Sequence, residues 1–125
     1  MTNLTKQSII KEIRHNGWWI MNDKELAEYR RSDMPENYDP NVAIFLSLSH
    51  RKEINNKWLS KIGKLTDLTD LHIDATNITD EGISELIGLS KLKTLNLRAT
   101  NITNKSLETI SQLKSLENIW LNQIS

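Results

Sequence analysis

The 125-residue sequence contains no cysteine, which excludes disulfide bridges, thiolate metal sites and thiol nucleophiles and is compatible with a reducing compartment. It also has no net charge, because sixteen Lys and Arg residues balance sixteen Asp and Glu residues. Non-specific nucleic-acid binding depends on clustered positive charge. The balanced composition therefore speaks against a nucleic-acid partner.

Long hydrophobic runs are missing as well. No segment approaches the ~20 apolar residues needed to span a bilayer, and residues 1–19 lack the apolar core and cleavage site of a secretory signal. We therefore expect a soluble cytoplasmic protein that has no membrane partner. Without a signal, the triplets Asn77–Thr79 and Asn101–Thr103 are interpreted as turn residues and not as glycosylation sites.

The motifs of common catalytic sites are absent too. There is no Gly-x-Ser-x-Gly elbow and no Gly-rich phosphate loop, and only His15, His50 and His72 could serve as an imidazole base. We expect no enzymatic activity, no catalytic residues and no cofactor.

What the sequence does contain is a repeat. The word ATNIT occurs at residues 75–79 and again at 99–103, which is 24 positions later, and the apolar residues around it recur at the same interval. A fixed interval indicates one structural unit copied along the chain. Four copies are readable, the first degenerate and the last incomplete, at residues 46–65, 68–89, 92–113 and 116–124.

The spacing of apolar residues changes within each copy. Leu71 and Ile73 alternate with polar residues, as in a short strand with one buried face. Ile83, Leu86 and Leu89 are spaced by three, which is typical of a short helix. Because no unit can bury its apolar face alone, we expect neighbouring units to stack and their strands to form a parallel sheet.

The ends of these helices have their own signals. A side chain at Thr79 or Asp80, and at Thr103 or Asn104, could cap the first turn of a helix. Gly63 and Gly88 lie near the far ends, where a left-handed residue could close it.

The pattern L-x-x-L-x-L-x-x-T-x-I-T-D resembles the leucine-rich repeat family, specifically its bacterial 24-residue type, over residues 43–125. The resemblance implies an α/β fold, a short leucine-rich-repeat solenoid with parallel strands on its concave face and short helices on its convex face. It also implies that Thr76 and Thr100 point inward, where their hydroxyls would bond to backbone of the adjacent turn. Outward strand positions usually carry partner binding in this family.

Residues 1–42 do not match the repeat. They read as an amphipathic helix from Asn3 to His15, an apolar cluster at residues 18–21, a second helix over residues 24–31 capped by Asp23, and an irregular connection containing Pro35 and Pro40. We expect a helical N-terminal cap at 1–42, with Trp18 and Trp19 inserted over the first repeat, and about three repeats plus a terminal strand at 43–125, in one structural domain. The alternative is that the aromatic residues face a partner.

Asp70, His72 and Asp74 share one face of a predicted strand and resemble a metal site. Side chains on the same face are about 7 Å apart, so a neighbouring strand would have to supply further ligands. The aligned residues there are Asn96 and Arg98, and arginine cannot ligate a metal. We expect no metal.

The outward strand positions are the candidate binding residues. In the predicted alignment Ser47, His72, Asn96 and Trp120 form a central column, and Asp74 lies beside Arg98, where the two could pair with each other. An outward Trp120 would either contact a partner or pack over the terminal strand. The predicted partner-binding residues are His50, Asp70, His72, Asp74, Asn96, Arg98, Trp120 and Asn122.

These features predict a non-catalytic protein–protein interaction module that binds a protein through its concave strand face. One concrete form is a small bacterial inhibitor, such as an immunity protein that blocks a toxin. The alternative is a structural building block, since the chain stops at Ile124–Ser125 directly after a strand. An uncapped strand could pair with a second copy to form a homodimer.

Overall fold

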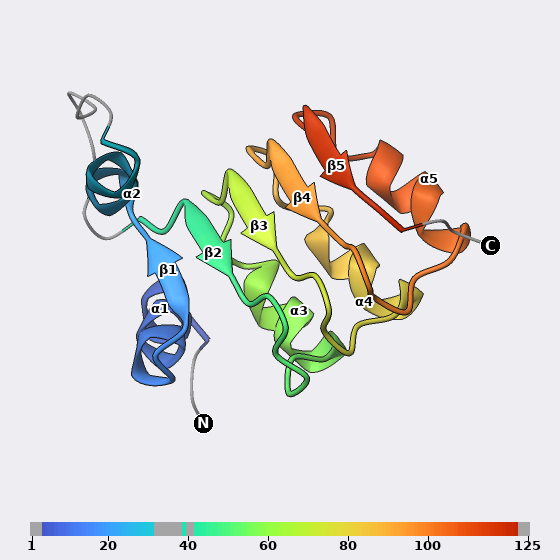
Figure 1. Cartoon of the computed structure of the whole chain (residues 1–125), viewed down its shortest axis with the longest axis horizontal. Coiled ribbons are helices and arrows are strands. Elements are labelled where there is room, and N and C mark those ends of the chain that lie inside the picture. Colours follow the sequence, from blue (N-terminus) through green and yellow to red (C-terminus); the bar gives the residue numbers. More distant parts are fainter. Residues whose placement is uncertain (1–3, 32–38, 40–41, 123–125) are drawn as a thin grey trace.

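The structure, a computed structural model, describes residues 4–31, 39 and 42–122. The predicted irregular connection containing Pro35 and Pro40, and the last apolar position, Ile124, lie outside these residues. The described part is α/β and contains a mostly parallel five-stranded sheet with five α-helices (Figure 1). The elements are α1 (Lys6–His15), β1 (Trp19–Met21), α2 (Asp23–Arg30), β2 (Phe45–Ser47), α3 (Asn56–Ile62), β3 (Asp70–His72), α4 (Asp80–Ile83), the 3-10 helix η1 (Ser84–Leu86), β4 (Thr94–Asn96), α5 (Lys105–Ser111) and β5 (Asn118–Trp120).

The sheet follows chain order, β1-β2-β3-β4-β5. Strands β2 to β5 are parallel, as the repeat predicts. Strands β2, β3 and β4 are each followed by a bend and a helix, and α3, α4 and α5 lie on the same side of the sheet (Figure 1). The fully buried core residues come from successive units at matching positions, so each unit completes the apolar layer of its neighbour. This core includes Leu46, Leu71, Leu95, Ile54, Ile78, Leu59, Ile83 and Leu86.

The bends after β2, β3 and β4 each contain a left-handed residue. His50, Ala75 and Ala99 have φ values of 64°, 55° and 56°. Their backbone N–H groups can continue the ladder past the strand, and those of His50 and Ala75 donate to the carbonyls of Asp74 and Arg98. The alanine of ATNIT is thus the residue that turns the chain from strand to helix.

The threonine of ATNIT also has a local role. Thr76 Oγ1 donates to the carbonyl oxygen of Ile73 at 2.7 Å, and Thr100 Oγ1 donates to that of Leu97 at 2.7 Å. Both bonds lie within one unit. The predicted bond to an adjacent turn is therefore wrong, because the acceptor three residues back is already within reach when the chain bends.

Other polar residues join neighbouring units. Asp80 accepts bonds from Thr103 N at 2.8 Å, Thr103 Oγ1 at 2.6 Å and Ser106 Oγ at 2.6 Å. Asn56 has the corresponding position one unit earlier. Its Nδ2 donates to Oγ1 of Thr79, and its Oδ1 accepts from the backbone N–H of Thr79. Thr79 and Asn104 stand at the N-caps of α4 and α5, but neither makes a side-chain capping bond.

We expect Asp80→Ala to lower the free energy of unfolding by about 2–3 kcal/mol, because it leaves three donors of the next unit without their acceptor. Urea denaturation at neutral pH measures this loss. Glu85→Ala, which removes an exposed carboxylate from the same unit, is the matched control and should cost less than about 0.5 kcal/mol. Equal losses in the two variants would contradict the joining role of Asp80.

The predicted left-handed helix ends at Gly63 and Gly88 are wrong. Gly63 has φ −60° and Gly88 is not among the residues with positive φ, whereas Gly17, after α1, has φ 73°. Gly63 is instead a point of close approach, since a Cβ there would lie 2.1 Å from the backbone oxygen of Glu85.

The two helices of the N-terminal segment begin with capping boxes. Thr5 and Ser8 cap α1, which confirms the first predicted helix with a later start. Asn22 and Glu25 cap α2, so Asn22 and not Asp23 is the N-cap. Strand β1 was not predicted, and it pairs antiparallel with β2 at the edge of the sheet.

Alternation along β1 separates the two neighbouring tryptophans. Trp18 is buried in the main core, 4.9 Å from the ring of Trp58, together with Ile9 and Ile13 of α1. Trp19 points to the other side of the sheet and is 42% exposed. Trp18 therefore packs on the core side of the first repeat, whereas Trp19 packs against Phe45 on the other face of the sheet.

Candidate protein-binding face

The sheet has one face turned away from α3, α4 and α5, and we call it the outward face (Figure 1). The strand pairing places Ser47 beside His72, His72 beside Asn96 and Asn96 beside Trp120. The predicted central column is confirmed by this register. The outward face comprises Trp19, Phe45, Ser47, Ser49, Asp70, His72, Asp74, Thr94, Asn96, Arg98, Asn118, Trp120 and Asn122.

Five ring side chains cross the outward face in contact with one another, and we call them the aromatic row. Ring centroids are 5.1 Å apart for Tyr29–Trp19, 5.1 Å for Trp19–Phe45, 5.5 Å for Phe45–His72 and 5.8 Å for His72–Trp120. Such tilted and edge-on contacts are favourable for aromatic rings. The rings therefore form one continuous series of contacts, carried by α2, β1, β2, β3 and β5.

Helix α2 covers one end of the outward face. Its Leu26 packs with Met21 and Phe45 in a small apolar cluster, and Phe45 is buried as a result. Trp19, beside α2, is 42% exposed, and Trp120 at the other end of the aromatic row is 40% exposed. The aromatic row is therefore accessible at both tryptophans.

The two acidic residues of β3 and its bend are already paired within the chain. Asp70 Oδ2 lies 2.8 Å from the guanidinium of Arg30 on α2. Asp74 accepts a bond from Ser49 Oγ at 2.5 Å and lies 3.7 Å from Nε2 of His50. Asp74 thus turns back to the preceding unit and makes no ion pair with Arg98.

Arg98 contacts an aromatic ring instead. Its guanidinium carbon lies 5.8 Å from the centroid of Trp120, and its backbone N–H donates to Oδ1 of Asn96 at 3.2 Å. Asn122 is exposed after β5. Trp120 therefore combines the two predicted alternatives, since it packs on its own chain through His72 and Arg98 and also presents exposed surface.

His72 lies in the middle of the aromatic row, half-buried between Phe45 and Trp120. Burial lowers the pKa of its imidazole below the usual 6.5; the charges of Asp70 and Asp74 act in the opposite direction, and Arg30 lowers the pKa further. The neutral ring is therefore favoured in the folded state.

This shift makes folding sensitive to mild acid. Because the folded-state pKa of His72 is below the unfolded value, its contribution to stability is complete above pH 6.5 and declines as pH falls from there toward the folded-state pKa. We expect His72→Gln to remove this part of the decline. Urea midpoints between pH 7.5 and 5 measure it, and a wild-type-like decline in His72→Gln would contradict the assignment.

Sequence reasoning missed Trp19, Tyr29 and Phe45 as members of the aromatic row. Phe45 had a usable signal, because it stands two positions before the outward Ser47 in a strand whose Leu46 points inward. Tyr29 had none, since its position depends on how α2 packs against β1. Trp19 would have been found only by recognising β1 as a strand.

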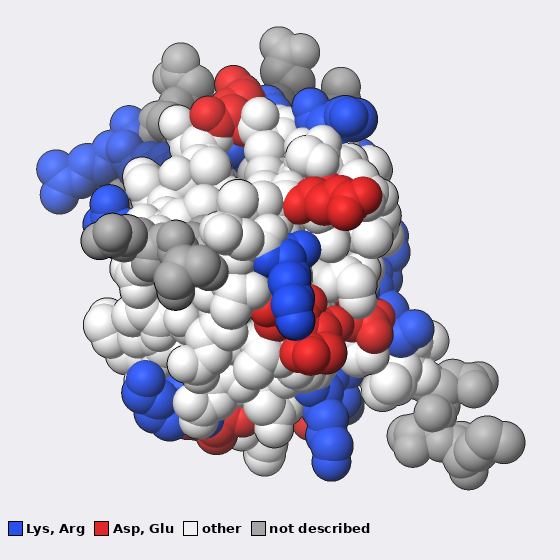
Figure 2. Space-filling view, turned by 90° about the vertical axis from the view of Figure 1, so that its right-hand side faces the viewer, with Lys and Arg blue, Asp and Glu red and all other residues white. Residues whose placement is uncertain are grey.

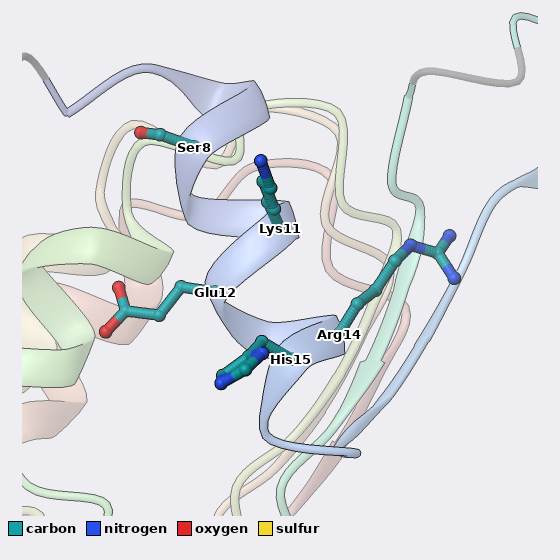
Figure 3. Close-up of a pocket in the computed structure, with 5 residues that line it drawn as sticks. All are labelled: Ser8, Lys11, Glu12, Arg14 and His15. Carbon is teal, nitrogen blue, oxygen red and sulfur yellow. The ribbon is translucent and has the colours of Figure 1, made fainter.

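A surface hollow of about 570 Å³ lies along α1 and is lined by Ser8, Lys11, Glu12, Arg14 and His15. Their side chains point in different directions and do not converge on one point (Figure 3). Glu12 is paired with Lys61 at 3.1 Å, and Arg14 with Glu25 at 2.9 Å. The hollow contains none of the predicted binding residues.

Among the described residues, no group of three His, Cys, Asp or Glu side chains could hold a metal ion. No helix in the same part of the chain is both long and apolar enough to cross a membrane.

Comparison with known proteins supports the fold. No protein-family model matches the sequence, and no curated protein matches it either. Among solved structures, the chain is similar to the one titled "Leiomodin-1 Actin-Binding Site 2 (ABS2)", with a TM-score of 0.53 and 16% sequence identity. The similarity covers 63% of this chain and 53% of that chain, so it spans about half of that structure. This likeness shows a shared fold.

Proposed function

We propose that this protein is a non-catalytic leucine-rich-repeat solenoid that binds another protein through its outward face. The aromatic row carries the proposal, because it presents partly exposed tryptophans on hydrogen-bonded strands that need little ordering when a partner binds. Tryptophan and arginine are also enriched among residues that dominate binding energy. The structurally similar protein is titled an actin-binding site, which is compatible with a protein-binding role for this fold.

The concrete form of this function that we favour is a small bacterial inhibitor, such as an immunity protein that covers the active site of a toxin. The predicted binding residues on the outward face mix aromatic, amide and paired charged groups, as protein interfaces do. The segment 1–42 would act as the N-terminal cap of the solenoid, with α1 and β1 covering the first repeat.

Selection from a displayed library of protein fragments encoded by the source genome tests the proposal. Clones that bind the wild-type protein are retested on Asn96→Glu, which adds a charged side chain to the centre of the outward face, and on Ile87→Glu, which adds it to an exposed position among the helices. We expect the Asn96 variant to lose binding and the Ile87 variant to retain it. Clones with the opposite dependence would contradict a binding role for the outward face.

A second candidate function is assembly through the β5 end. Among the described residues, β5 pairs only with β4. Two apolar side chains at this end are partly exposed, Ile119 of β5 at 36% and Leu107 of α5 at 43%. Figure 2 shows this end of the molecule, where charged residues of both signs are scattered over a largely uncharged surface. Light scattering distinguishes the two functions, because assembly predicts a dimer that Ile119→Lys converts to a monomer.

A further inference from the structure

Arg98 is an exposed cation of the outward face that has no ion pair with any residue the structure describes. By contrast, Asp70 is paired with Arg30 and Asp74 with Ser49 and His50. The carboxylates of Asp70 and Asp74 therefore contact other partners. Among the described residues, Arg98 is left as a cation without an ion pair at the β5 end of the outward face.

The surroundings of Arg98 limit how it can move and what it can bind. Its guanidinium lies over the ring of Trp120, and its backbone N–H donates a hydrogen bond to Oδ1 of Asn96. This bond leaves the Nδ2 group of Asn96 as a donor, and no acceptor for it occurs in the described part of the chain. Guanidinium and amide donors thus lie beside a partly exposed aromatic ring.

We infer that Arg98, Asn96 and Trp120 form a subsite for an Asp or Glu carboxylate, and that the partner docks an acidic, apolar-containing segment on the outward face. The inference rests on the proposed function and names the chemistry of its partner. A guanidinium binds a carboxylate through two parallel hydrogen bonds, and the cation–π contact with Trp120 keeps the guanidinium of Arg98 beside that ring beforehand. The ring of Trp120 then accepts the apolar side chain next to the acid.

A carboxylate fits this subsite better than a phosphate group does. Phosphate-binding sites for peptides are built from clusters of arginines, and this subsite has one. His72 supplies no second charge, because burial between Phe45 and Trp120 favours its neutral form. The balanced composition of the chain is unlike that of a nucleic-acid-binding surface as well.

Fluorescence anisotropy with four synthetic peptides tests the inference. One short peptide alternates Asp and Glu with Leu and Phe, and the others replace the acids by Asn and Gln, by Lys, or by phosphoserine. We expect the acidic peptide to bind at least about tenfold more tightly than the amide peptide, and added salt to reduce that ratio. Equal binding, tighter binding of the lysine or phosphoserine peptide, or no binding of the acidic peptide would overturn the inference.

Substitutions assign the effect to the subsite. Arg98→Gln should reduce the preference for the acidic peptide to less than about twofold, whereas Arg98→Lys should keep part of it, since it retains the charge and loses the planar fork. Lys93→Gln removes an exposed cation from the same unit and is the matched control, with the preference unchanged. A preference that survives Arg98→Gln would overturn the subsite.

The inference and the proposed function fail separately. One outcome is a selected partner that depends on the outward face and yet binds Arg98→Gln as tightly as wild type, with no effect of salt. Such a partner would overturn the acidic subsite. The same result would leave protein binding by the outward face in place.

Discussion

Gly63→Ala is expected to destabilise the protein by about 3 kcal/mol, a large part of the 5–15 kcal/mol typical of a domain. A Cβ at Gly63 would lie 2.1 Å from the backbone oxygen of Glu85 and 3.1 Å from its carbonyl carbon. Backbone cannot rotate away as a side chain can, so α3 would have to separate from η1. Urea denaturation followed by circular dichroism measures the loss.

Substitutions at two other glycines serve as comparisons for the loss of stability in Gly63→Ala. A Cβ at Gly82 would meet the side-chain atoms Asn56 Oδ1 at 2.2 Å and Leu59 Cδ1 at 2.8 Å, which can shift, so Gly82→Ala should cost less than Gly63→Ala. A Cβ at Gly88 would meet no atom nearer than 3.8 Å, so Gly88→Ala should be neutral or stabilise by up to about 1 kcal/mol. If Gly63→Ala proves as mild as Gly88→Ala, the close packing of α3 against η1 is wrong.

Trp120→Ala is expected to weaken binding of an outward-face partner by about 30-fold or more, which corresponds to the 2 kcal/mol or more of a dominant interface residue. Trp120 is partly exposed on β5 and contacts His72 and Arg98, so its removal ends the aromatic row and frees the guanidinium. The free energy of unfolding should fall by no more than about 1 kcal/mol. Titration calorimetry with a selected partner measures the affinity.

Leu107→Ala is the matched control for this prediction. Leu107 on α5 is 43% exposed, close to the 40% of Trp120, but it belongs to the helix side of the sheet. Its substitution should change affinity by less than about twofold, since residues outside an interface contribute little. An equal loss of affinity in the two variants would indicate that partners bind the β5 end and not the outward face.

The repeat in the sequence predicted much of this fold because apolar residues recur at the positions that are buried in every unit. The register of the central column could be read from the 24-residue spacing, and Leu71 and Ile78 are buried as their spacing requires. Strand β1 could not be predicted in this way. It occurs once, and its antiparallel pairing with β2 depends on a contact between segments far apart in the chain.

The candidate site was less predictable for a related reason. The alignment placed Asp74 beside Arg98 correctly, but each charged side chain has several neighbours within reach and contacts only some of them. Asp74 contacts Ser49 and His50 of the preceding unit, and Arg98 contacts Trp120 of the following unit. Spacing gives the neighbours of a side chain, whereas rotamers and competing partners decide which of them it contacts.

Chemical-shift mapping with ¹⁵N-labelled protein locates the binding surface when a selected partner is titrated in. Binding through the outward face predicts that the largest amide shifts fall in β3, β4, β5 and the bends that follow β3 and β4, around His72, Arg98 and Trp120. It predicts small shifts in α3, α4 and α5. Shifts confined to those helices would contradict the claim that this protein binds its partner through the outward face of its sheet.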